Sequence, residues 1–177
     1  MVFTEVNSTT LKVIDTGISS REICYWCGVS NSFVLDWSLR QSVTTTLNMF
    51  FIYQLRVPRL SDADVRFAAI AHRAARLICT TPDFDDLAKS AGLLPHSNPR
   101  PSPGQALLAE GEGARYGATD ATERAQLRAE LDGLVAHLYG LTESEFVHIL
   151  GSFPLVAEAV KKAAHQAYRD VENGLIR

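Results

Sequence analysis

Apolar side chains recur every three or four residues along most of this chain, which is the spacing that places them on one face of an α-helix. The clearest stripe ends at Leu138 and includes Leu127, Leu131, Leu134 and Val135. Elsewhere the same spacing is interrupted by prolines, glycines and polar capping residues. The pattern predicts helices from Ser19, from Ser30 or Asn31, from Ser61, over 83–91, from Thr119 or Asp120 to Leu138, from Thr142 to about Gly151, and from about Pro154 to Asn173.

A different pattern marks the N-terminus, where residues 2–6 and 11–15 alternate in part between apolar and polar side chains. Such alternation predicts two short strands. The sequence therefore predicts a mainly α fold with a small β component at the N-terminus and a helical bundle at the C-terminus. We place a boundary between residues 1–60 and 61–177, and predict an exposed Pro/Gly-rich loop over 92–119.

Charge is unevenly distributed. The formal net charge is −3, but six arginines and only two aspartates lie between Arg40 and Arg76, so that stretch carries +4 and the rest −7. A basic stretch of this kind can follow nucleic-acid phosphates, or can be an ordinary solvated helix face. Neither a signal peptide nor an apolar run long enough to span a membrane is visible, and three cysteines are too few for a disulfide framework. We expect a cytoplasmic protein.

Motifs for catalysis are missing from the sequence. It has no GxSxG, no Gly-rich phosphate loop and no HExxH, and it contains no Pro-Pro pair of the kind found in the active-site motif of DNA base methyltransferases. Cys24 and Cys27 form a CxxC without a second ligand pair, so we interpret them as core residues of a helix. Asp132 and His137 are interpreted as buried, hydrogen-bonded groups. We expect neither a catalytic residue nor a metal site in this chain.

Two segments nevertheless resemble a known family. The first is Asn31-Ser32-Phe33-Val34-Leu35-Asp36-Trp37-Ser38-Leu39-Arg40-Gln41, continuing through Leu47-Asn48 to Gln54-Leu55-Arg56-Val57-Pro58. The second is Arg128-Ala129-Glu130-Leu131-Asp132-Gly133-Leu134-Val135-Ala136-His137-Leu138-Tyr139-Gly140-Leu141-Thr142, followed by residues 146–156, which end in Phe153-Pro154-Leu155-Val156. Both are similar to the C-terminal region, comprising the end of the target-recognition domain and the tail, of bacterial type II and type IIG restriction-modification or phage-defence DNA methyltransferases.

The resemblance implies N6-adenine methylation of duplex DNA by a catalytic half that this sequence lacks. S-adenosylmethionine is expected in that half, and no cofactor is expected in this chain. Residues 1–60 would then be the end of a target-recognition domain, and 61–177 a helical tail. The chain is either a C-terminal piece of such an enzyme or a separate specificity subunit, with double-stranded DNA and the catalytic methyltransferase domain or subunit as its partners.

The same resemblance suggests which residues meet DNA. Arg40 is expected to read guanine and Gln41 adenine, because these side chains match those base edges in the major groove. Phosphate or thymine-methyl contacts are expected from Thr44, Thr45, Thr46 and Asn48, although here Ser42–Thr46 replaces the Lys and Gly pair that relatives often carry. Phosphate contacts are also expected from the three helix arginines Arg66, Arg73 and Arg76. For each residue the alternative is an ordinary surface side chain or a spacer between helices.

A second hypothesis remains open. The chain can instead be a helical protein-interaction subunit that docks a methyltransferase or nuclease without touching DNA. Small apolar residues at Ala157, Val160, Ala164 and Ala167 would form the docking seam, though an internal packing face explains them equally well.

Overall fold

The computed structural model describes residues 17–42, 49–61, 63–95 and 116–177, and in these parts the chain is all α. The mainly α prediction is therefore confirmed, while the two strands predicted within 2–15 lie outside the described residues. The elements are α2 (Ser20–Ser30), α3 (Phe33–Ser42), α4 (Met49–Tyr53), α5 (Val65–Ile78), the 3₁₀ turn η1 (Pro82–Phe84), α6 (Asp85–Ser90), α7 (Ala121–Leu138), α8 (Glu143–Gly151) and α9 (Glu158–Glu172).

Side-chain caps set most of the helix starts. Asp120 accepts a hydrogen bond from the Glu123 amide at the start of α7, and Thr142 forms a capping box with Glu145 at the start of α8, as the sequence predicts. The start predicted at Ser61 is wrong by several residues. Asp64 caps α5 instead, because its carboxylate reaches the Arg66 amide.

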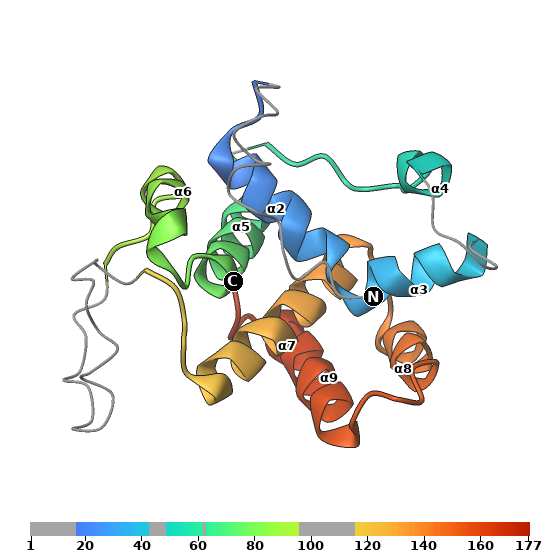
Figure 1. Cartoon of the computed structure of the whole chain (residues 1–177). Helices are drawn as coiled ribbons and strands as arrows, with labels where there is room; N and C mark the ends of the chain where they lie inside the picture. The colour runs from blue at the N-terminus through green and yellow to red at the C-terminus, as the bar shows by residue number, and fades with distance from the viewer. Residues whose placement is uncertain (1–16, 43–48, 62, 96–115) are drawn as a thin grey trace.

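Helix α7 is the centre of the fold. It packs along α9 on one side and against α5 on the other, and α5 in turn packs along α2 (Figure 1). Every residue from Leu131 to Ala136 is buried, so this part of α7 has no solvent-facing side. A helix that is covered all round belongs to the core rather than to the surface.

Close packing of α7 on α9 requires a glycine. A Cβ on Gly133 would lie 2.7 Å from the backbone carbon of Ala167 and 2.8 Å from the amide nitrogen of Tyr168. Next to this contact, Nε2 of His137 lies 2.9 Å from the carbonyl oxygen of Tyr168, and the two rings stack with centroids 4.1 Å apart. The hydrogen bond predicted for His137 is thereby confirmed, while its side chain is half-buried rather than buried.

The loop predicted as exposed over 92–119 is buried in part at its described ends. Leu93, Tyr116 and Ala118 are all buried, and the Ala118 amide donates to the carbonyl of Arg76 at 2.7 Å. Gly117 lies so close to the carbonyl of Cys79 that a Cβ there would approach its oxygen to 2.3 Å. The prediction of exposure is therefore wrong for Leu93, Tyr116 and Ala118, and Gly117 and Ala118 cover the C-terminal end of α5. It is confirmed for the other described end residues, which are exposed: Gly92, Leu94, Pro95 and Thr119.

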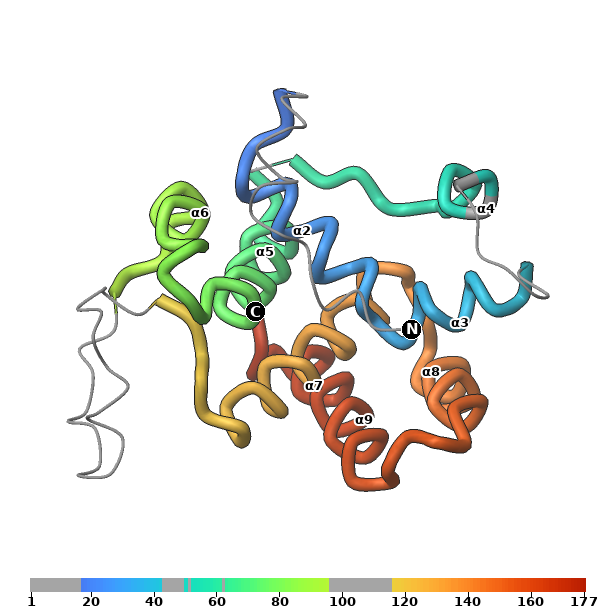
Figure 2. Tube along the Cα trace, viewed as in Figure 1, coloured from blue at the N-terminus to red at the C-terminus, as the bar shows by residue number. Residues whose placement is uncertain are grey.

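An extended arm over residues 54–61 joins α4 to the start of α5. The tube in Figure 2 shows α4 standing away from the α5–α7–α9 core, with this arm crossing back toward α5. Leu55, Val57 and Leu60 pack in part against the core. Among the described helices, none is long and apolar enough to cross a membrane.

The Gly133 contact gives a direct test of the core. Gly133→Ala is expected to destabilise the fold by about 1–3 kcal/mol, because the added methyl overpacks the α7–α9 contact. This loss should outweigh the gain of about 1 kcal/mol in helix propensity. Gly151→Ala is the matched control, since a Cβ at Gly151 meets nothing within 4 Å. Urea unfolding should show the first variant less stable and the second no less stable than wild type; equal stability of the two variants would contradict the close approach.

Candidate functional site

The two segments that carry the family resemblance meet at a buried junction. The Phe33 amide, at the start of α3, donates a hydrogen bond of 2.9 Å to Oδ1 of Asp132 on α7, across a sequence separation of 99 residues. The Leu35 amide donates to Oγ of Ser32 at 3.3 Å, so Ser32 acts as the helix cap in place of the predicted Ser30 or Asn31. Asp132, which lies on α7, thus accepts a hydrogen bond from a backbone amide at the N-terminus of α3 that has no partner within α3.

Aromatic packing continues the junction. The rings of Phe33 and Phe153 meet edge to face with centroids 4.9 Å apart, which joins the start of α3 to the residues just after α8. The guanidinium of Arg40 lies over the same Phe153 ring, with its central carbon 4.7 Å from the ring centroid. The first segment therefore lies on the second along the length of α3.

Two tyrosines fix the arm that follows α4. The Tyr139 hydroxyl donates to the carbonyl of Arg56 at 2.9 Å, and the Tyr25 hydroxyl donates to the carbonyl of Pro58 at 2.6 Å. Burial raises the pKa of each of these two tyrosines to about 12, so both hydroxyls stay protonated and remain donors at neutral pH. Sequence reasoning missed both roles, although Tyr139 stands within the second resembling segment.

Burial makes the Asp132 carboxyl unusual. Removal from water raises its pKa to about 7, although the Phe33 amide and the charge of Arg128 both favour the ionised form. The predicted structural role of Asp132 is confirmed by its burial and its hydrogen bond.

Arg40 and Gln41 lie near the exposed C-terminal end of α3. Arg40 forms a two-bond ion pair with Asp36 at 2.9 and 3.0 Å, yet its side chain is 52% exposed. Gln41 is exposed, and its amide contacts the carbonyl of Trp37 at 3.4 Å. Both side chains are thus accessible to a large partner. Thr44, Thr45, Thr46 and Asn48 lie outside the described residues.

The arginines of α5 have partners within the chain. Arg66 pairs with its own helix cap, Asp64, at 2.7 Å. Arg73 pairs with Glu130 of α7 at 2.6 Å, where its side chain is only 16% exposed, and Arg76 pairs with Glu123 of α7. The last two pairs tie α5 to α7. The structure does not gather these three arginines with Arg40 and Gln41, since one set lies along α5 and the other at the end of α3.

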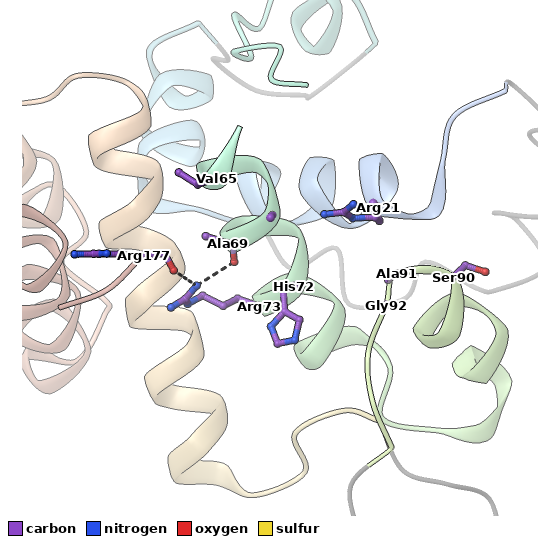
Figure 3. Close-up of a pocket in the computed structure, with 10 residues that line it drawn as sticks. Arg21, Val65, Ala69, His72, Arg73, Ser90, Ala91, Gly92 and Arg177 are labelled. Atoms are coloured by element: carbon purple, nitrogen blue, oxygen red, sulfur yellow. Dashed lines mark hydrogen bonds between the residues drawn. The ribbon is translucent and has the colours of Figure 1, made fainter. Parts of the chain in front are cut away.

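An open hollow of about 730 Å³ lies beside α5, at the end of α6 (Figure 3). Its lining includes four basic side chains, Arg21, His72, Arg73 and Arg177, and no acidic one. Within it, Nη1 of Arg73 donates to the carbonyls of Ala69 and Arg177, both at 3.2 Å. Arg73 is therefore held by backbone oxygens as well as by Glu130.

The described residues hold no group of three His, Cys, Asp or Glu side chains able to bind a metal ion. Cys24 and Cys79 are buried, and burial raises their pKa to about 12 and about 11, which keeps these thiols protonated and poorly nucleophilic. The core role predicted for Cys24 is confirmed by its complete burial.

Comparisons of the chain with protein-family models, with curated proteins and with solved structures find no match.

The junction predicts a pH dependence. The raised pKa means that folded Asp132 keeps a proton that the unfolded chain loses above about pH 4, so its contribution to stability falls as pH rises to about 7. Asp132→Asn keeps an oxygen for the Phe33 amide and removes the titration. The variant's stability relative to wild type should rise by about 2–3 kcal/mol between pH 5 and pH 8. Urea unfolding at both pH values measures this difference, and a constant difference would contradict it.

Proposed function

We propose that this chain is a non-catalytic DNA-recognition and assembly module of an S-adenosylmethionine-dependent adenine-N6 DNA methyltransferase from a restriction-modification or phage-defence system. Catalysis and S-adenosylmethionine binding then belong to a separate domain or subunit. The proposal rests on the resemblance of two segments, and the observation that supports it most strongly is that these segments pack into one unit.

The packing explains why particular residues of the second segment stand where they do. Asp132 caps α3, Gly133 admits the α9 backbone, and Tyr139 holds the arm. The three residues lie on α7 or at its C-cap, so the contacts with α3, α9 and the arm all depend on the position of this one helix. A recognition domain placed on such a support would be held rigidly, as target reading requires.

Direct DNA contact is assigned in this proposal to the end of α3. Arg40 and Gln41 are exposed there, and the sequence that follows them carries the threonine and asparagine candidates. Arg40 has a competing partner, Asp36, which neutralises part of its charge in the free protein. An arginine that contacts a guanine edge or a phosphate would have to share its guanidinium with that carboxylate.

One observation favours the second candidate function, a docking subunit without DNA contact. Arg73 and Arg76 are engaged with α7, which reduces the cationic surface available for phosphate. The predicted alanine seam is internal in part, since Ala164 and Ala167 are buried. A docking surface on this side would instead begin at Leu155, which is 99% exposed, and Val160, which is 49% exposed.

Fluorescence anisotropy of the chain on random duplex DNA across a salt series tests the proposal. Wild type is expected to bind, with affinity falling steeply as salt rises. Replacing both Arg40 and Gln41 by alanine should weaken binding while circular dichroism stays unchanged. Asp36→Asn is the matched variant, and should strengthen binding because it releases the Arg40 guanidinium from its ion pair. Absence of binding at low salt would contradict the DNA-recognition function and favour the docking function. Unchanged affinity in both variants would show that Arg40 and Gln41 do not contact the DNA.

A further inference from the structure

The structure shows which arginines of the basic stretch from Arg40 to Arg76 are paired with carboxylates. Four of its six arginines have a carboxylate partner within the fold: Arg40 with Asp36, Arg66 with Asp64, Arg73 with Glu130, and Arg76 with Glu123. The other two are Arg56 and Arg59, both on the arm. No ion pair joins either of them to another residue in the described parts of the chain, so the positive charge of this stretch is concentrated there.

Both of these side chains are exposed to solvent, whereas the apolar side chains of the arm are not. Leu55, Val57 and Leu60 are partly buried against the core, whereas Arg56 and Arg59 are exposed. No acidic residue occurs from Gln54 to Ser61. The arm thus presents two arginine side chains to solvent and apolar side chains to the protein.

The tyrosine hydrogen bonds hold this face in place. They engage the carbonyls of Arg56 and Pro58, one residue on each side of Val57. Because the backbone at these positions is fixed before any partner arrives, less conformational entropy is lost when the arginines bind. A surface loop without such anchors would lose more.

Helix α4 extends the exposed surface next to the arm. Phe50 is 63% exposed and Tyr53 is 79% exposed, and they are three residues apart, on the same side of the helix. In Figures 1 and 2 this helix stands clear of the core helices. Phe50 and Tyr53 thus add exposed aromatic side chains to the chain just before the arm.

We infer that Arg56 and Arg59 contact the phosphate backbone of duplex DNA. This inference rests on the proposed function and adds a phosphate-contacting surface to it. Three residues of extended chain span at most about 11 Å, and duplex DNA carries one phosphate charge per roughly 1.7 Å of its axis. Both guanidinium groups can therefore meet phosphates at the same time. Phosphate contacts fix the register of a protein on DNA, while Arg40 and Gln41 supply base contacts.

The test is the salt dependence of DNA binding by the double variant Arg56→Gln/Arg59→Gln. Loss of two phosphate contacts should reduce the slope of log affinity against log salt by about 1.8. Between 50 and 200 mM salt, wild type should consequently lose roughly tenfold more affinity than the variant. The change should be the same on duplexes of different sequence, since phosphates carry no sequence information.

The matched control is Lys89→Gln/Lys162→Gln, which removes the same charge from exposed positions on α6 and α9. It should keep the wild-type slope. If wild type binds DNA and the arm variant keeps the full slope, or if the control loses as much slope as the arm variant, the assignment to Arg56 and Arg59 is wrong while the proposed function stands. If wild type binds no DNA even at low salt, the phosphate surface and the DNA-recognition function are both overturned.

Discussion

A hydrogen bond from the Phe33 amide to the Asp132 carboxyl joins the start of α3 to α7, and with it the two segments that carry the resemblance. A buried carboxyl is costly, and that cost appears as a pKa raised to about 7. The cost is partly offset because the start of α3 offers an unsatisfied amide and the positive end of a helix dipole. Once α3 is fixed on α7, Phe33 meets Phe153 and Arg40 lies over the same ring, so the orientation of the exposed end of α3 follows.

The six arginines from Arg40 to Arg76 fall into two groups, those paired with carboxylates of this chain and those exposed on the arm. Arg73 and Arg76 each form an ion pair that joins α5 to α7. Loss of either partner from such a partly buried pair is destabilising, because it leaves the other charge without compensation. Arg56 and Arg59 project from an arm that tyrosine hydroxyls hold in place. A chain with net charge −3 can therefore present a local positive surface without a high overall charge. In the proposed function, α7 supports recognition, and the end of α3 with the arm carries it out.

Much of the helical architecture could be predicted from local sequence, because caps and apolar periodicity act within a few residues. The starts of α7 at Asp120 and α8 at Thr142 are examples. The pairing of Arg76 with Glu123 could not be predicted, since 47 residues separate them and the composition of α5 alone suggests a solvated basic face. Burial of Tyr116 and Ala118 was likewise missed, because glycine and proline content predicts a loop but not what the loop packs against. Of the candidate site, Arg40 and Gln41 are exposed, and their contact with DNA stays a prediction. The exposed arginines of the arm could be recognised only from the three-dimensional packing, because sequence alone does not show which of the six arginines have carboxylate partners.

Native-state hydrogen exchange of Asp132→Ala, compared with wild type, tests most directly whether this carboxyl joins the two segments. The account predicts that amides of α3, Phe33 first among them, lose protection, while amides of the α5–α7–α9 core keep most of theirs. Unchanged protection of the Phe33 amide in the variant would contradict the central role of the Asp132 hydrogen bond, as would a uniform loss of protection through all helices.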